Sequence, residues 1–465
     1  MASAYQYIST RGGMKPVGFC DAVLTGLAPD GGLVLPAAVP DVRDRLDAWQ
    51  ALPYPQLAAE VMACFVGPDL PRRCLDTMAD DAYAAFDHPD VIPVLPVGEV
   101  HVMELFHGPT LAFKDVALQF LGHLFEHILR ERGTSLNILG ATSGDTGSAA
   151  IAGVRGKPNI EIFIMHPRNR VSPIQERQMT TVLDDNVHNI AIEGTFDDGQ
   201  RILKELFRDL EFKRTYRLGA INSVNWARVL AQIVYYFHAA FRMREATGCE
   251  AIQAAVPTGN FGDIFAGYMA RRMGAPVDRL ILATNANDIL CRFFREGTYE
   301  LGQVHSTLSP SMDIQVASNF ERYLYYRLNQ DPGWVAETMT RFQKSGVLDV
   351  PGQDPAFVAG QRTDEQTLQT IARYKNQHQY LLDPHTAVGV SVAEEFLRAD
   401  TPTVCLATAH PAKFQHAIRR ALGQDDGHHP AIDALFDKPT RCETLPADAA
   451  AVADFIRNTL KTPQR

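Results

Sequence analysis

The chain has 465 residues, which at roughly 100–200 residues per domain allows two or three domains with a sizeable core. Its hydrophobic fraction of 46% is ordinary for a globular protein, and its formal net charge of -10 argues against a general nucleic-acid binder, which normally presents a basic face. The absence of a bilayer-length apolar run, of a secretory apolar stretch and of any Cys-x-x-Cys pair among the seven cysteines predicts a cytoplasmic protein without a membrane partner, a disulfide framework or a metal site.

The first part of the chain, residues 1–96, is predicted to form an N-terminal domain. It is rich in proline, alanine and aspartate and has few strand signals, and helices are expected over residues 41–50 and 55–66. Residues 91–96 (VIPVLP) contain two prolines, which favour an extended backbone, so we interpret them as the connection into the next domain.

Strands and helices alternate from about residue 105 onward. Apolar runs predict strands over residues 136–139, 160–165, 187–192, 252–256, 280–283 and 403–407. Helices are expected over residues 115–130, 225–243 and 263–273, the second of them long and amphipathic, and Thr195 and Asp198 should cap another. This alternation predicts an α/β fold of parallel sheets flanked by helices, with a large domain of residues 97–130 and 222–465 and a small domain of residues 131–221. Ligands bind such sheets at the carboxyl ends of strands, so the loops after the strands are candidate sites.

The first candidate loop, residues 259–262 (GNFG), lies between a predicted strand and a predicted helix that should end at Gly274. Glycine lets the backbone adopt positive φ and turn several N–H groups toward one point, and the helix N-terminus adds further free N–H groups. We interpret the loop either as a phosphate cradle or as a plain tight turn. Asp263 would bring a carboxylate close to a phosphate, and a role as helix cap would explain its presence.

A second glycine-rich loop, residues 140–147 (GATSGDTG), also lies between a predicted strand and a predicted helix. It lacks the Walker A register and contains no lysine, so a nucleoside triphosphate would have no cation partner there. Ser143, Thr146 and the nearby N–H groups suit a carboxylate ligand, while Asp145 is expected to orient the loop. A polar loop that only caps the helix remains the alternative interpretation.

Two further segments carry single residues of interest. Lys114 follows Phe113 at the predicted start of a helix, and apolar surroundings disfavour its ammonium form, as a Schiff-base lysine requires. A solvated surface lysine is the alternative. Thr408 and His410 stand at the end of a predicted strand, and Pro411 begins a helix. The Thr408 hydroxyl is placed to meet a ring nitrogen, with a helix cap as the alternative.

Six segments together resemble the threonine synthase family, in the family's order and across essentially the whole chain. They are residues 7–13 (YISTRGG), 106–114 (FHGPTLAFK), 143–147 (SGDTG), 259–262 (GNFG), 318–322 (SNFER) and 408–414 (TAHPAKF). The long N-terminal region resembles the branch shared by yeast and many bacteria. The resemblance implies a pyridoxal-phosphate enzyme of fold type II, the tryptophan-synthase-like fold.

This resemblance also implies roles for single residues. Lys114 holds pyridoxal 5'-phosphate as a Schiff base and moves protons along the substrate carbons, and Thr408 faces the pyridine nitrogen. The residues around the cofactor phosphate are Gly259, Asn260, Phe261, Gly262 and Asp263. The loop that takes the substrate carboxylate consists of Ser143, Gly144, Asp145 and Thr146.

The implied reaction converts O-phospho-L-homoserine and water into L-threonine and phosphate, the last step of threonine biosynthesis. A phospho-lyase that yields 2-oxobutyrate from the same substrate is the nearest alternative, followed by a dehydratase or β-replacement enzyme and by a non-catalytic ligand-binding protein. The substrate phosphate needs a cation, and the candidates are Lys15, Arg168, Arg170, Arg228 and Lys413. The sequence leaves the oligomeric state open.

Overall fold

The computed structural model describes residues 5–142, 144–348, 350–351 and 353–460. Residue contacts divide the chain into two compact units, the first made of Met1–Ala117 with Ser223–Gly427 and the second of Leu118–Asn222 with His428–Arg465. This division differs from the sequence-based one at both ends of the chain. Residues 1–96 group with the larger unit, and the C-terminal segment groups with the smaller one.

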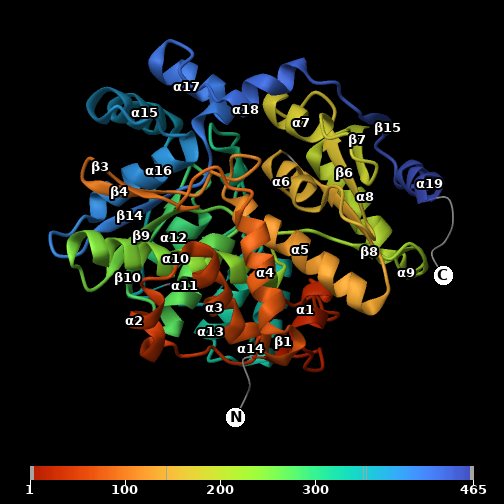
Figure 1. The fold of residues 1–465 in the computed structure, drawn as a ribbon, viewed down its shortest axis with the longest axis horizontal. Coiled ribbons are helices and arrows are strands. Elements are labelled where there is room, and N and C mark those ends of the chain that lie inside the picture. The colour runs from red at the N-terminus through yellow and green to blue at the C-terminus, as the bar shows by residue number, and fades with distance from the viewer. Residues whose placement is uncertain (1–4, 143, 349, 352, 461–465) are drawn as a thin grey trace. The chain divides into compact units, whose positions relative to one another are not determined.

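The larger unit contains a six-stranded sheet of order β13-β10-β9-β14-β4-β3 (Figure 1). Its strands are β3 (Val94–Val97), β4 (Val100–Glu104), β9 (Ile252–Pro257), β10 (Val277–Thr284), β13 (Phe357–Gln361) and β14 (Thr403–Ala407). All neighbours are parallel except β3, which pairs antiparallel with β4 at the edge of the sheet. The segment expected as an extended connection therefore ends in this edge strand, where proline is tolerated.

Helices cover both faces of this sheet because successive side chains of a strand point to opposite faces. Ala255, Ile281 and Cys405 share one buried cluster with α15 (Asp364–His378) and α16 (Pro384–Ala393). Leu280 points the other way and lies 2.9 Å from the position of a Cβ at Gly267 of α11 (Gly262–Met273). The carboxyl ends of β9 and β14 lead into the two candidate loops of this unit.

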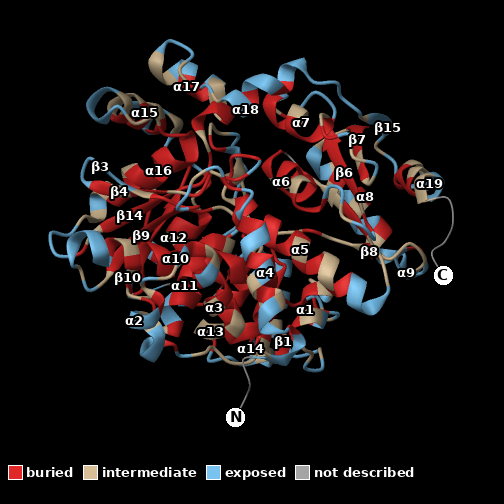
Figure 2. Cartoon of the chain, viewed as in Figure 1, coloured by how far each residue is buried: buried red, intermediate tan, exposed pale blue. Residues whose placement is uncertain are grey.

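Helix α10 (Trp226–Thr247) runs through the interior of the larger unit and is buried on nearly every face (Figure 2). The prediction of an amphipathic helix was therefore wrong in one respect, although Asn225 does cap its N-terminus. Its opposite sides meet two helices, α3 (Tyr54–Val66) through Trp226 and Phe65 and α11 through Tyr236 and Gly267. Residues 226–241 of α10 leave no face for solvent, so the polar residues of this stretch, Arg228, Gln232 and His238, are buried as well.

The N-terminal region contributes a two-stranded ribbon, β1 (Tyr7–Ser9) with β2 (Val34–Pro36), and the helices α3 and α4 (Arg72–Tyr83). The helix expected over residues 41–50 is reduced to a 3-10 turn and the four residues of α2 (Leu46–Trp49). Arg11 forms a salt bridge with Glu321 at 2.7 Å, which ties the chain's opening segment to α13 (Phe320–Arg327).

The smaller unit has a five-stranded parallel sheet of order β15-β7-β6-β5-β8. Its strands are β5 (Leu136–Ala141), β6 (Ile160–Pro167), β7 (Val187–Glu193), β8 (Leu218–Gly219) and β15 (Glu443–Pro446). Its helices include α6 (Asp145–Val154), α7 (Pro173–Thr180), α8 (Phe196–Arg208) and α19 (Ala449–Leu460). The C-terminal segment belongs here because β15 extends the sheet beside β7.

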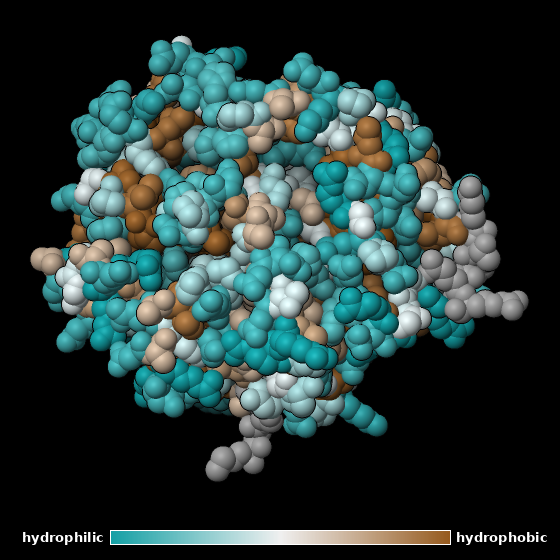
Figure 3. All heavy atoms as spheres, viewed as in Figure 1, coloured by the Kyte–Doolittle hydropathy of each residue, from teal (hydrophilic) through white to brown (hydrophobic). Residues whose placement is uncertain are grey.

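Predictions that depend on residues within a single strand or helix are confirmed in both units. The predicted strands lie within β5, β6, β7, β9, β10 and β14, and Thr195 and Asp198 form a capping box at the start of α8. Hydrophilic side chains dominate the face of the molecule in view, with apolar residues in scattered spots (Figure 3). Among the residues described, no helix combines the length and the apolar composition needed to cross a membrane.

Candidate active site

Lys114 is the first residue of α5 (Lys114–Arg132), and only 8% of its surface is exposed. Its Nζ lies 5.6 Å from the centroid of the Phe113 ring. The backbone before it pairs with the loop after β14: the N–H of Phe113 donates to the carbonyl of Thr408 at 2.8 Å, and the N–H of His410 donates to the carbonyl of Leu111 at 3.1 Å. These bonds bring Lys114 and Thr408 together, and the burial of Lys114 contradicts the alternative of a solvated surface lysine.

The residue after it, Asp115, is fully buried and fixes the turn that presents Lys114. Its carboxylate accepts hydrogen bonds from the N–H and the hydroxyl of Thr110, at 2.8 and 2.7 Å, and Lys413 donates to the carbonyl of Thr110 at 2.7 Å. Burial raises the pKa of Asp115 to about 6 against these hydrogen bonds and the nearby Lys413 charge. Gly108 is needed here because a Cβ would lie 2.4 Å from that of Asp115.

The glycines of the loop between β9 and α11 serve close approach rather than positive φ. A Cβ at Gly259 would lie 2.5 Å from the carbonyl oxygen of Ser311, and one at Gly262 would lie 3.1 Å from Nδ2 of Asn319. The positive φ, 62°, falls instead on Phe261, whose ring packs edge-on against Phe320 at 5.2 Å. The expectation about glycine conformation was therefore wrong, and a buried aromatic ring holds the left-handed residue in place.

The N-terminus of α11 has no side-chain cap, so the N–H groups of its first turn have no side chain bound in the cap position. On the other side of the loop, the carbonyl of Asn260 accepts from the N–H and Nδ2 of Asn319, at 3.0 and 3.2 Å. The negative end of the Asn260 carbonyl therefore points at Asn319, and the N–H groups at the start of α11 are left to bind an anion. This arrangement favours the phosphate cradle over the plain turn.

Asp263 does not cap its own helix. Its Oδ1 accepts from the hydroxyls of Tyr235 and Tyr236 on α10, the latter at 2.9 Å. Burial raises its pKa to about 6 although both tyrosines lower it, and its Oδ2 has no hydrogen-bond partner among the described residues. The helix-cap interpretation is corrected by these contacts, because the long tyrosine side chains reach the carboxylate from a helix distant in sequence.

Thr408, at the end of β14, is 6% exposed and bound through its backbone. Its N–H donates to Oγ1 of Thr386 at 3.2 Å, and its carbonyl accepts from Phe113. Its own hydroxyl has no hydrogen-bond partner among the described residues. His410, not Thr408, caps the following 3-10 turn, since its Nδ1 accepts from the N–H of Ala412 at 3.2 Å. The helix-cap alternative for Thr408 is thereby contradicted.

The SNFER segment supports the phosphate loop from behind. Asn319 binds the carbonyls of Asn260 and Ser223 through Nδ2. Arg322, with no exposed surface, donates to the carbonyls of Val34 and Val224 and to Oδ1 of Asn319. Sequence reasoning assigned these residues no role, because their partners are backbone atoms far away in the chain.

In the smaller unit, Thr142 organises the second glycine-rich loop. Its Oγ1 accepts from the N–H groups of Gly144 and Gly147, both at 3.0 Å. Gln175 of α7 donates to Oδ1 of Asp145 at 2.8 Å, so this carboxylate is bound within its own unit. A Cβ at Gly144 would lie 2.4 Å from Cδ of Gln175, which makes glycine necessary there.

Two further residues of this loop, Ser143 and Thr146, are predicted to bind the substrate carboxylate. Thr146 is half-buried in the first turn of α6, and Ser143 lies outside the described residues. Gly144, at the N-cap position of α6, has no side chain to cap the helix, and in the first turn the N–H of Gly147 is already bound by Thr142. A loop of this kind suits a singly charged anion such as a carboxylate.

The five candidate cations differ in burial. Lys15, Arg168 and Arg170 are exposed, and Arg168 pairs with Glu193 at 3.0 Å. Lys413 is 2% exposed. Arg228 is 4% exposed, and neither its Nε nor its Nη1 has a hydrogen-bond partner among the described residues. Burial lowers the pKa of Arg228 to about 10.

Arg228 lies on the face of α10 that meets the phosphate loop. Residues 228, 232 and 235 recur at helical spacing and share one face of α10. Gln232 lies 3.9 Å from the Cβ position of Gly262, and Tyr235 binds Asp263. The two helices run in the same direction, because Gly262 of α11 lies near Gln232 and Gly267 lies beside Tyr236. The turn of α10 that carries Arg228 is therefore level with the loop before α11. An unpaired buried guanidinium on that face is suited to an anion.

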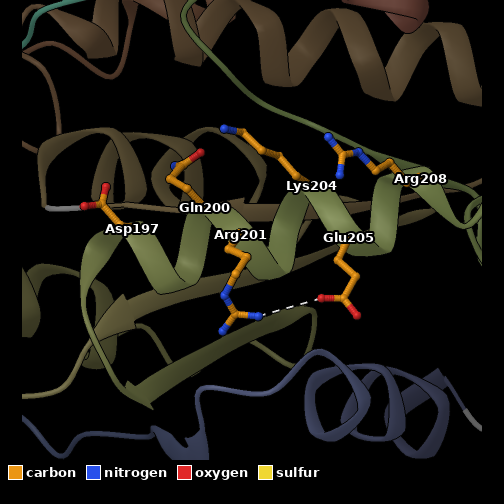
Figure 4. A pocket seen from close by; sticks show the side chains of 6 residues that line it. All are labelled: Asp197, Gln200, Arg201, Lys204, Glu205 and Arg208. Carbon is orange, nitrogen blue, oxygen red and sulfur yellow. Dashed lines mark ion pairs between the residues drawn. The ribbon is translucent and has the colours of Figure 1, made fainter.

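A surface hollow of about 480 Å³ along α8 is a different kind of feature (Figure 4). It is lined by Asp197, Gln200, Arg201, Lys204, Glu205 and Arg208. These are solvated charges on one helix, and Arg201 pairs with Glu205 at 3.7 Å. None of the six residues belongs to a candidate loop identified from the sequence. The buried loops therefore define the candidate site, and this hollow does not.

Known proteins match this chain along nearly its whole length. The family description "Threonine synthase N terminus" matches residues 6–83, "Pyridoxal-phosphate dependent enzyme" matches residues 95–335, and "Threonine synthase, C-terminal" matches residues 386–456. The threonine synthase of Pseudomonas aeruginosa is 48% identical over 97% of this chain and 98% of its own length. The chain belongs to the threonine synthase family. Family membership makes it a pyridoxal-phosphate-dependent lyase with threonine synthase function.

Other members of the threonine synthase family support the fold. The Schizosaccharomyces pombe enzyme is 43% identical over 95% of both chains. A crystal structure of pyridoxal-phosphate-bound threonine synthase from Brucella melitensis superposes with a TM-score of 0.94 at 43% identity, covering 98% of this chain and all of that one. The yeast structure gives the same TM-score at 38% identity, covering 98% and 99% of the two chains. The predicted fold class and cofactor are confirmed.

Proposed function

We propose that this chain converts O-phospho-L-homoserine and water into L-threonine and phosphate, with the cofactor attached to Lys114. The observation that carries the proposal is a buried lysine held by backbone hydrogen bonds beside Thr408, whose hydroxyl has no hydrogen-bond partner in the described part of the chain. When bound, pyridoxal phosphate supplies the electron sink for proton removal at the carbons of an amino acid. Phosphate leaves from Cγ, and water adds at Cβ.

The residues around Lys114 fit the cofactor. The uncapped N-terminus of α11 offers N–H groups to a phosphate, with Gly259, Asn260, Phe261, Gly262 and Asp263 around it. Thr408 faces the pyridine nitrogen, and its neutral hydroxyl does not hold that nitrogen protonated. Lys114 carries protons between the substrate carbons, since its buried amine is shielded from water.

The substrate is held by two further sets of groups. The carboxylate is taken by the loop of Ser143, Gly144, Asp145 and Thr146, where Asp145 orients the loop through Gln175. The substrate phosphate is taken by Arg228, because it is the candidate cation that is both buried and without an acceptor among the described residues.

One product analysis tests the proposal. The purified holoenzyme is incubated with O-phosphohomoserine, and threonine, 2-oxobutyrate and phosphate are measured. Threonine and phosphate in equal amounts are expected. Phosphate with 2-oxobutyrate would instead identify the phospho-lyase, in which water does not add at Cβ, and the absence of phosphate would refute both reactions.

We also propose a cytoplasmic location for the enzyme. Among the described residues, none of the seven cysteines forms a disulfide, which suits a reducing compartment. Fractionation of cells that express the natural chain tests this, and recovery outside the cytoplasm would refute it.

A further inference from the structure

The N-terminus of α16 contains a hydrogen-bonded network that the reaction described above does not use. Asp383 caps the helix and is 1% exposed. Its Oδ1 accepts from the N–H and Nδ1 of His385, both at 2.9 Å. Its Oδ2 accepts from the N–H of Thr386 at 3.3 Å and from the Thr386 hydroxyl. Four donors thus converge on one buried carboxylate.

One end of this network reaches Thr408. The Thr386 hydroxyl gives its proton to Asp383, so its oxygen is left to accept the N–H of Thr408 at 3.2 Å. The direction of each hydrogen bond is fixed, because a hydroxyl has one proton and a carboxylate can only accept. Asp383 therefore holds the backbone of Thr408 through a single intermediate.

The other end reaches the phosphate loop. The N–H of Ser311 donates to Nε2 of His385 at 3.2 Å, and a backbone N–H can only donate. His385 is thereby the neutral tautomer with its proton on Nδ1, bound to Asp383. The carbonyl of the same Ser311 lies against Gly259, 2.5 Å from the position of a Cβ there. The ring of Phe414 packs edge-on against His385, with the two ring centroids 4.9 Å apart.

We propose that Asp383 and His385 are positioning residues that set the distance between the Gly259 loop and Thr408. These are the two places where the proposed function puts the phosphate and the pyridine nitrogen of one rigid cofactor, so the inference rests on that proposal. A rigid ligand held at both ends requires both contacts at a fixed separation, which supporting hydrogen bonds provide. His385 connects to the phosphate end and Thr386 to the nitrogen end, with Asp383 between them.

Two substitutions of His385 separate the ends. In His385→Asn the amide nitrogen takes the place of Nδ1 and keeps the Asp383 contact, while the acceptor for Ser311 is lost. In His385→Gln the amide oxygen takes the place of Nε2 and keeps Ser311, while the donor to Asp383 is lost. The measurements are the dissociation constant of pyridoxal phosphate, from titration of the apoenzyme, and the visible absorption spectrum of the holoenzyme against pH.

Opposite patterns are expected from the pair. The asparagine variant should bind pyridoxal phosphate up to about ten-fold more weakly with an unchanged band, since one net hydrogen bond is worth about 0.5–1.5 kcal/mol. The glutamine variant should shift the band or its pH dependence while its affinity stays within about three-fold of wild type. His238→Asn is the matched control: this buried histidine donates from Nε2 to the carbonyl of Ile92, which the shorter asparagine side chain does not reach, so the variant should lose stability with neither readout changed.

A second pair keeps the test decisive if the His385 variants fail to fold. Thr386→Val removes the hydroxyl and should shift the band, whereas Thr386→Ser keeps it and should restore the wild-type spectrum. Wild-type affinity and spectrum in every folded variant, or changes that only follow the loss of stability as in the His238 control, would overturn the proposal. A wild-type protein without a visible band would instead refute the cofactor link at Lys114.

Discussion

Replacing Arg228 by methionine should make the apoenzyme more stable and the enzyme less active. Burial lowers the pKa of Arg228 to about 10, well below the ordinary value of an arginine, which corresponds to roughly 3 kcal/mol against the charged form at about 1.4 kcal/mol per pKa unit. The folded pKa is below the unfolded one, so this cost is fully present at neutral pH and is relieved only as the pH rises through about 10. Methionine keeps the unbranched chain and removes the charge.

The magnitude follows from these terms. Urea unfolding is measured on the apoenzyme at about pH 7.5, which is well below 10. The free energy of unfolding of Arg228→Met should be about 1–3 kcal/mol higher than that of wild type. The kcat/KM for O-phosphohomoserine should fall by roughly 10- to 150-fold, because hydrogen bonds to a charged group are worth about 1.5–3 kcal/mol. The affinity for pyridoxal phosphate should change by less than about three-fold if Arg228 serves the substrate phosphate.

Arg322→Met is the matched control, because burial also lowers the pKa of Arg322, to about 9, but its guanidinium is bound to two carbonyls and to Asn319. Its loss leaves buried acceptors unpaired and should destabilise the apoenzyme by about 1–3 kcal/mol, the opposite sign. A less stable Arg228→Met apoenzyme with unchanged kcat/KM would refute the reasoning. A fall in cofactor affinity alone would reassign Arg228 to the cofactor phosphate.

Four further outcomes are expected. Lys114→Ala should lose the visible band and essentially all turnover, and full activity would end the cofactor assignment. Gly259→Val should bind pyridoxal phosphate far more weakly in apoenzyme titrations, because its Cβ meets the Ser311 carbonyl at 2.5 Å; unchanged affinity would favour a plain turn. Thr408→Val should lower kcat by roughly ten-fold to a few hundred-fold, with a wild-type rate and spectrum refuting the ring-nitrogen contact. Asp263 has a folded pKa of about 6 above its usual 3.8, so its contribution to stability falls as the pH rises from about 4 to 6; Asp263→Asn should flatten that part of the curve, and an unaltered curve would contradict the shift.

The sequence by itself determined the elements and the loops that carry chemistry. Apolar runs predicted three strands in each of the two larger sheets, and the capping box of Thr195 and Asp198 fixed the start of α8. Lys114, Thr408 and the glycine loops were identified because each lies at the end of a strand or the start of a helix. Such signals are local, since backbone hydrogen bonds and side-chain periodicity involve residues a few positions apart.

Only the tertiary structure decided what those residues touch. The carboxylate of Asp263 binds two tyrosines of α10, Phe261 takes the positive φ, and residues 226–241 of α10 are buried on all sides rather than amphipathic. β15 joins the smaller unit because it pairs with β7. Its sequence is short and polar and therefore gives no signal for a strand. The unpaired charge of Arg228 is likewise invisible in sequence, because the burial of a charge and the lack of an acceptor depend on segments far apart in the chain packing around it.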